Sequence, residues 1–407
     1  MKKIILVLVA VAWGFSCSSP VQKELLSGAW HAEMQVADSL WLPVDLVVSK
    51  TANEKYVLQI KNAEEVIDVD EITIQGDSIW IKMPVFEGYI VGTFTDSTIV
   101  GSFNKESLER YVPVIAKYGE YPRFAVNKKP DFDVSGIWET EFDFDTDGPY
   151  PAKGIFAQTG DKVTGTFRTK TGDYRYLEGV MDGDSLKLST FDGAHVFLFA
   201  AAVKDSSMQG TFYSGNHAVE NFIAKRNAAF ELPDANTLTY LKEGYTTFDF
   251  SFPDENGNIV SLSDESFQNK VVLVQIMGTW CPNCLDETKF YRDYLKKNPN
   301  ADLEIVALAF EYAKTEEKAF TGIRRLRERV GVGYPILLAQ TGTSSKSKAN
   351  EKLPMLNHVL SYPTTIYIDK KGGVRKIHTG FNGPATGEKH EEFKKDFAAT
   401  LQELLQE

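Results

Sequence analysis

VVLVQIMGTWCPNC, residues 271–284, joins an apolar run directly to a Cys-x-x-Cys pair. The run has the composition of a buried strand, and the residues after Cys281 follow a helical pattern. This arrangement places the first thiol at the positive end of a helix, where a thiolate is favoured over a thiol. Cys284 lies about one helical turn further on, close enough to close a small disulfide ring. The pair is therefore a candidate redox site, in which one thiol attacks a disulfide and the other resolves the mixed disulfide.

Cys17 is the third cysteine of the chain and has a different context. Near its start the chain has Lys2 and Lys3, followed by an apolar stretch from Ile4 to about Phe15. This stretch is shorter than the ~18 residues that a membrane span needs. Together with the small residues and the cysteine that follow, this stretch resembles a bacterial lipoprotein signal. We expect residues 1–16 to be removed and Cys17 to carry a lipid that anchors the chain to a membrane. A plain secretory signal with an incidental cysteine is the alternative.

The overall composition limits the possible classes of function. The chain has 407 residues, 43% of them hydrophobic, which suffices for two or three domains with cores of their own. A formal net charge of −12 argues against nucleic-acid binding, which needs a basic surface. His31, His195 and His217 lack metal-ligand spacing, so we expect no metal site, and no cofactor is indicated.

The front half of the chain is predicted to be all-β, in a barrel- or sandwich-like arrangement, because short alternating runs recur between turn residues. Three motifs occur twice in this half, in the same order. Gly28-Ala-Trp30 is repeated after 108 residues, Gly76-Asp-Ser-Ile79 after 107 and Gly101-Ser-Phe103 after 109. We infer two copies of one β unit, over residues 25–126 and 132–226, with a tether over 17–24 before them.

The function of the duplicated units is less defined than their existence. Their Gly-x-Trp opening resembles the first strand of lipocalin-like barrels. Trp30, Trp41, Trp80 and Trp138 could line a ligand cavity, but we favour the interpretation that they fill ordinary β cores. A spacer, a dimerisation surface or a docking platform is the expected role.

An α/β domain is predicted over residues 246–407, after a linker at 227–245. A hairpin over 248–262, with a tight two-residue turn at Asn256-Gly257, is expected first. The expected strands and helices then alternate, with a polar insertion at 341–352. The strands are 271–276, 303–309, 335–338, 364–369 and 374–379, and the helices are 282–297, 316–330 and 388–405. This alternation indicates a mixed sheet covered on both faces.

The stretch from Lys270 to Cys284, followed by YPTTIYID at 362–369, resembles the TlpA/ResA-type thioredoxin-like disulfide oxidoreductases. The resemblance covers residues 246–406 and implies a thioredoxin-like fold. It implies that Cys281 is the attacking thiol, that Cys284 is the buried resolving thiol and that Pro363 is a cis-proline opposite the pair.

The same resemblance implies further site residues. Trp280, Pro282, Tyr362 and Thr364 are expected to shape a partly exposed surface where an extended substrate binds beside the cis-proline. Asn283 departs from many relatives, which have proline immediately before the second cysteine; the dipeptide between the thiols tunes their relative stability.

Three acidic or amide positions near the motif are also candidates. Glu287 matches a family acid thought to help proton transfer, although an ordinary acid in the first turn of a helix is an equal alternative. Gln275 stands where thioredoxins carry a buried Asp. Glu311 is expected to be a solvated loop residue.

The leading hypothesis is a lipid-anchored thiol-disulfide oxidoreductase on the periplasmic side of the cell envelope, acting as a reductase on envelope proteins with disulfides and recharged by a membrane electron donor. A peroxidase is a minor alternative, because Gly278 stands where such enzymes need a threonine. A non-enzymatic alternative is an envelope binding or scaffold lipoprotein, whose β region binds a ligand or partner and whose redox domain is accessory.

Overall fold

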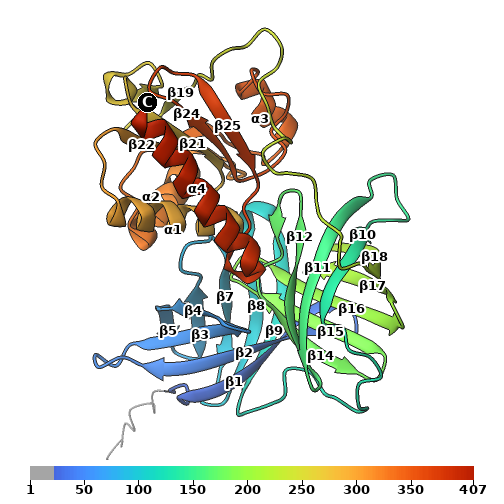
Figure 1. The fold of residues 1–407 in the computed structure, drawn as a ribbon. Helices are drawn as coiled ribbons and strands as arrows, with labels where there is room; N and C mark the ends of the chain where they lie inside the picture. Colours follow the sequence, from blue (N-terminus) through green and yellow to red (C-terminus); the bar gives the residue numbers. More distant parts are fainter. Residues whose placement is uncertain (1–22) are drawn as a thin grey trace, which may run out of the picture.

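The computed structural model describes residues 23–407, which form two β bodies and a C-terminal α/β domain (Figure 1). The predicted signal at 1–16 and the predicted lipidation of Cys17 lie outside the described residues. No helix among the described residues is long and apolar enough to cross a membrane.

The first β body is a single antiparallel sheet in the order β4-β3-β2-β1-β9-β8-β7-β6-β5. Its inward side chains alternate with outward polar ones, as a sheet with one buried face requires. The strands are β1 (Gly28–Ala37), β2 (Leu40–Lys50), β3 (Tyr56–Asn62), β4 (Glu65–Val69), β5 (Glu71–Gln75), β6 (Ser78–Lys82), β7 (Tyr89–Phe94), β8 (Thr98–Lys105) and β9 (Arg110–Tyr118). A short 3-10 turn, η1, spans Glu106–Leu108.

The second β body has the order β11-β10-β18-β17-β16-β15-β14-β12-β13, which matches the first except that β12 pairs with β14 as well as with β11. The additional pairing of β11 with β12 closes this sheet on itself, whereas in the described part of the first body β4 and β5 are the two edge strands and do not pair with each other. The strands are β10 (Gly136–Phe142), β11 (Tyr150–Thr159), β12 (Lys162–Thr169), β13 (Gly172–Asp173), β14 (Leu177–Asp182), β15 (Ser185–Phe191), β16 (Val196–Lys204), β17 (Ser207–Ser214) and β18 (Ala218–Arg226).

The repeated motifs have the same geometry in both bodies. Trp30 and Trp138 are both buried, and each indole N–H donates to the carbonyl four residues before it, at 2.9 and 2.8 Å. Gly76 and Gly183 both adopt positive φ angles, 63° and 64°, in the turns before β6 and β15. These matches support the duplication inferred from the sequence.

The prediction that the tryptophans fill β cores is confirmed for two of the four. Trp30 and Trp138 are core residues, and Trp41 is half-buried. For Trp80 the prediction is wrong, because its side chain is 43% exposed on the outer face of β6.

The C-terminal domain is built on a five-stranded mixed sheet in the order β23-β22-β21-β24-β25. The parallel strands β21, β22 and β23 are buried along nearly their whole length, which is why their sequences are continuous apolar runs. The strands are β21 (Val271–Met277), β22 (Leu303–Phe310), β23 (Ile336–Gln340), β24 (Thr364–Ile368) and β25 (Val374–Thr379).

The long helices α1 (Pro282–Lys297), α2 (Glu316–Val330) and α4 (Glu388–Gln406) lie within one residue of the predicted ranges. The 3-10 turns η2 (Glu265–Phe267) and η3 (Pro384–Thr386) lie between regular elements. The hairpin of β19 (Ser251–Pro253) and β20 (Ile259–Ser261) precedes the sheet.

One local expectation needs correction, and two further local features were not predicted. The hairpin loop spans residues 254–258, and Gly257 alone of the expected pair has a positive φ angle, so the two-residue turn is wrong. The polar insertion contains a short helix, α3 (Lys346–Lys352). The linker at 227–245 packs on the C-terminal domain: Thr379 N donates to Ala235 O at 3.0 Å, and Leu241 forms a β-bridge with Leu356.

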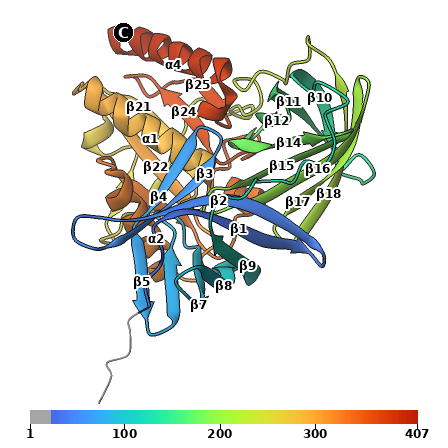
Figure 2. The same ribbon diagram turned by 90° about the horizontal axis from the view of Figure 1, so that it is seen from below.

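The two β bodies lie side by side, and the C-terminal domain contacts both of them (Figures 1 and 2). Arg123, between the two sheets, donates to Asp45 and Asn62 of the first body and to Ser189 of the second. On α2, Arg325 and Arg329 pair with acids of the first body. The second body reaches the C-terminal domain at a different place, beside the cysteine pair.

Candidate active site

Cys281 and Cys284 are joined by a disulfide at the start of α1. The buried strand β21 leads directly to this point, and Pro282 occupies the first turn of the helix, where its missing N–H costs no hydrogen bond. Cys281 is the N-cap residue, and its Sγ accepts a hydrogen bond from Cys284 N at 3.1 Å. Developing negative charge on this sulfur would face the positive end of the helix. Cys284 is fully buried and Cys281 is 6% exposed, so Cys281 is the thiol placed to attack first.

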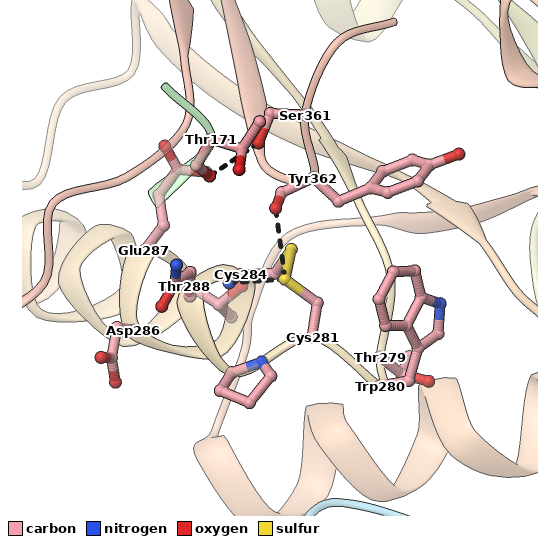
Figure 3. Close-up of a disulfide and its surroundings, with 12 residues drawn as sticks. Thr171, Thr279, Trp280, Cys281, Cys284, Asp286, Glu287, Thr288, Ser361 and Tyr362 are labelled. Atoms are coloured by element: carbon pink, nitrogen blue, oxygen red, sulfur yellow. Dashed lines mark hydrogen bonds between the residues drawn. A yellow bond between two sulfur atoms is a disulfide. The ribbon is translucent and has the colours of Figure 1, made fainter. Parts of the chain in front are cut away.

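The loop before β24 lies opposite the cysteines. The Tyr362–Pro363 peptide is cis, as the resemblance implied, and the Tyr362 carbonyl oxygen lies 3.4 Å from Cys281 Sγ (Figure 3). Trp280 stands beside the pair with its indole N–H bonded to Phe310 O at 2.9 Å. Its ring meets the Tyr362 ring edge-to-face, with centroids 5.5 Å apart. These contacts fix the positions of the aromatic residues around the attacking sulfur.

Glu287 lies in the interior behind the disulfide, one turn beyond Cys284. Its carboxylate accepts hydrogen bonds from Gln275 Nε2 at 2.8 Å, from Tyr291 OH at 3.0 Å and from Thr365 Oγ1 at 3.0 Å. Burial raises the pKa of Glu287 to about 7, and these hydrogen bonds oppose the rise only partly. A carboxyl group with that pKa exchanges protons near neutral pH, and its burial distinguishes Glu287 from a solvated acid in the first turn of a helix.

Glu311 was expected to be solvated, and that expectation is wrong. Its side chain is buried, and its two oxygens accept from Thr279 N at 2.7 Å and Thr279 Oγ1 at 2.8 Å. Burial raises the pKa of Glu311 to about 7. The carboxylate thus holds the turn between β21 and Trp280 in place, a role that the sequence did not reveal because its partner is a backbone amide.

The predicted substrate surface is more enclosed than expected. Pro282 and Tyr362 are buried, and only Trp280 is half-exposed. Thr364 is fully buried, and its hydroxyl donates to Ser361 O at 2.9 Å, so its side chain supports the cis-proline loop from within instead of facing a substrate.

Part of this enclosure comes from the second β body, a contribution that could not be predicted from the sequence. Ser361 Oγ donates to Thr171 O at 2.8 Å, beside the disulfide (Figure 3). Asn283 Nδ2, between the cysteines, donates to Asp173 O at 3.1 Å. Arg175 forms an ion pair with Asp286, two residues after Cys284. The candidate site is therefore assembled from two parts of the chain more than a hundred residues apart.

Comparison with known proteins agrees with this geometry. The Redoxin family profile matches residues 242–395. A thioredoxin-like protein, YneN of Bacillus subtilis, is 31% identical over 144 residues, which are 34% of this chain and 73% of that protein. The chain belongs to this redoxin family of thioredoxin-like proteins. A thiol-disulfide oxidoreductase, ResA of Geobacillus kaustophilus, is 30% identical over 142 residues, covering 35% of this chain and 72% of its own length.

Among solved structures, a thiol-disulfide oxidoreductase from Bacteroides fragilis is similar at 21% identity with a TM-score of 0.27, covering 37% of this chain and 99% of its own. The relatives thus account for the C-terminal domain, which is a thioredoxin-like thiol-disulfide oxidoreductase domain, preceded here by the all-β region. Within residues 23–407 no cluster of three or more His, Cys, Asp or Glu side chains could hold a metal ion.

Proposed function

We propose that the protein is a membrane-anchored, extracytoplasmic reductase that exchanges electrons with disulfides of envelope proteins through Cys281 and Cys284. The observation that carries this proposal is the position of Cys281, which caps a helix and lies opposite a cis-proline with its resolving partner buried behind it. Anchoring through lipidated Cys17 and the periplasmic location rest on the sequence of the leader.

The reaction proceeds in two exchange steps. The Cys281 thiolate attacks one sulfur of the substrate disulfide, forming a mixed disulfide and releasing the other sulfur as a thiolate, which takes a proton. The Cys284 thiolate then attacks the Cys281 sulfur and releases the second substrate sulfur. Two electrons have passed to the substrate, and the protein holds the disulfide seen in the structure. A membrane electron donor is needed to return the pair to the dithiol.

Glu287 is the group that we assign to the proton transfer of the resolving step. Cys284 has no exposed surface, so water cannot take the proton that its thiol must lose before it attacks. Glu287 lies one turn away along the same helix, and Gln275 Nε2 lies 3.5 Å from Cys284 O and 2.8 Å from Glu287. We infer that Glu287 accepts the Cys284 proton in the resolving step.

The reduction potential of the Cys281–Cys284 couple tests the proposed direction of electron flow. The purified protein would be equilibrated with dithiothreitol or glutathione buffers, and the fraction of disulfide read by thiol trapping. A potential near that of thioredoxin, about −270 mV, supports a reductase. A potential near about −120 mV would mean an oxidant, and the reductase assignment would fall.

A further inference from the structure

Residues 170–175 of the second β body, here called the cap segment, contact the cis-proline loop, the loop after β25 and the start of α1 beside the cysteine pair. The first contact is with the loop before the cis-proline. Ser361 Oγ donates to Thr171 O at 2.8 Å (Figure 3). A Cβ added to Gly380 would lie 2.9 Å from the Thr171 carbonyl carbon, so the loop after β25 can approach this closely only because it has glycine there.

The second contact is with the dipeptide between the cysteines. Asn283 Nδ2 donates to Asp173 O at 3.1 Å. A Cβ added to Gly172 would lie 2.0 Å from the same Nδ2, so glycine is required for the close approach on this side as well. The Asp173 carboxylate also accepts from Gly383 N at 2.7 Å. The segment thus fills the space over Asn283 down to the loop that follows β25.

The third contact is electrostatic and buried. Arg175 forms ion pairs with Asp286 of α1 and Glu65 of the first β body, and it lies 3.7 Å from Asp192 of its own body. Its Nη1 also donates to Pro282 O at 3.4 Å. The side chain is only 7% exposed, so losing it would leave three carboxylates without their shared cation in a dry environment. Arg175 therefore holds all three parts of the molecule in the closed arrangement.

A cavity lies on the far side of Trp280, and its lining does not include Cys281. It has a volume of about 260 Å³ and borders Thr279 and Trp280, which directly precede Cys281. Its far wall belongs to the first β body and includes Lys82, Glu87 and Tyr89. A space of this size can accept a small molecule but not a folded protein.

We propose that the cap segment selects the substrates of the redox site: it keeps protein disulfides from Cys281 until the second β body moves away, while small disulfides react with Cys281 without that movement. This inference rests on the proposed function, because it concerns access to the same thiol. An extended protein substrate would pair with the backbone beside the cis-proline, and the cap segment lies against Ser361, the residue that precedes Tyr362. The all-β region would then regulate the reaction directly.

The test compares a small and a protein disulfide on the reduced protein. The rate of Cys281–Cys284 oxidation is measured with 2-hydroxyethyl disulfide and with insulin, for the wild type, Arg175→Ala and Gly172→Ala. Arg329→Ala, which removes an exposed ion pair between α2 and the first β body, is the matched control. Near-ultraviolet circular dichroism checks that each variant is folded.

We expect Arg175→Ala to raise the insulin rate at least about tenfold, because losing a buried ion-pair partner shifts the closed arrangement by more than one decade in population. Gly172→Ala should raise it in the same direction, and the rates with 2-hydroxyethyl disulfide should stay within about twofold, as in the Arg329→Ala control. Equal insulin rates in all four proteins would contradict substrate selection by the cap segment. Changes of the same size with insulin and with 2-hydroxyethyl disulfide would also contradict it. If wild type and variants react with neither disulfide, the proposed function itself fails.

Discussion

The two β bodies share repeated sequence motifs and a similar strand order but attach to the redox domain in different ways. The first body holds α2 through pairs such as Arg329–Asp70, whose side chains are 31% and 50% exposed. The second body inserts residues 170–175 beside the disulfide and holds them through Arg175, which is almost completely buried. The two bodies therefore share the geometry of their buried tryptophans, while in the described part of the chain only the second places a loop beside the cysteine pair.

The difference is local to the third hairpin of each unit. In the first body the turn at Ala63 leads into β4, a strand of five residues, and Glu65 at its start reaches Arg175. In the second body the corresponding turn leads into β13, which has only two residues, Gly172 and Asp173. The short strand leaves the backbone after β12 free to lie on the neighbouring domain.

The largest expected effect concerns the buried tryptophan that each β body contains. Trp138→Ala and Trp30→Ala should each lower the free energy of unfolding by about 3–5 kcal/mol, because both indoles are buried in the sheet core and bonded to the carbonyl four residues earlier. Urea denaturation measures the change. A loss below about 1 kcal/mol for either variant would show that the two copies do not use this residue in the same way.

The ion pairs that attach the two β bodies to the redox domain should contribute different amounts to the free energy of unfolding. Arg175→Ala should cost about 3–5 kcal/mol, because it leaves buried carboxylates unpaired. Arg329→Ala should cost less than about 1 kcal/mol, because its ion pair is exposed to solvent. Thermal unfolding of both variants at one pH provides the comparison. Similar losses from the two substitutions would contradict the contrast between the attachments.

The buried acid behind the cysteines should make stability depend on pH. The pKa of Glu287 is raised to about 7 by burial, so the folded protein binds more protons than the unfolded chain between its ordinary pKa of 4.5 and about 7. Stability from this group is fully present below pH 4.5 and is lost as the pH rises to 7, by roughly 2–3 kcal/mol.

Glu287→Gln should remove this loss, and urea denaturation at pH 4, 6 and 8 measures it. The advantage of the variant over the wild type should grow with pH. The same variant should slow the resolving step above pH 7, while Arg329→Ala leaves both properties unchanged. An identical pH profile for wild type and Glu287→Gln would remove the basis for a proton-accepting role.

The smallest expected effect comes from comparing substitutions in the third hairpin of each β body. Gly172→Ala should cost about 1–2 kcal/mol, because φ is 143° and the new methyl group would meet Asn283. Ala63→Gly, at the corresponding turn of the first body with φ of 50°, should change stability by less than about 0.5 kcal/mol. Chemical denaturation of both variants would reveal whether close packing is confined to the second turn.

The elements with strong periodicity could be predicted from the sequence. Helices α1, α2 and α4 fall within one residue of their expected ranges, because each is a long segment with helical periodicity. α3 was missed because it is short and polar, and the turn at Asn256-Gly257 was misjudged because the closing loop is longer than two residues.

The residues of the site could be predicted only where they lie close together in the sequence. Cys281, Cys284 and the cis-proline at 363 follow from two contiguous motifs. Arg175 could not be found, because its partners Glu65, Asp192 and Asp286 come from three different parts of the chain and no local pattern links them. Burial of Glu311 likewise depends on a tertiary contact, the backbone amide of Thr279.

The most direct measurement of the central claim is to trap the mixed disulfide. Reduced Cys284→Ser protein would be treated with 2-hydroxyethyl disulfide and its peptides mapped by mass spectrometry, with Cys281→Ser as the matched variant. The account predicts a stable adduct on Cys281 in the first variant, none on the buried Cys284 in the second, and a resolved intramolecular disulfide in the wild type. An adduct on Cys284, or no adduct on either cysteine, would contradict the assignment of Cys281 as the attacking thiol.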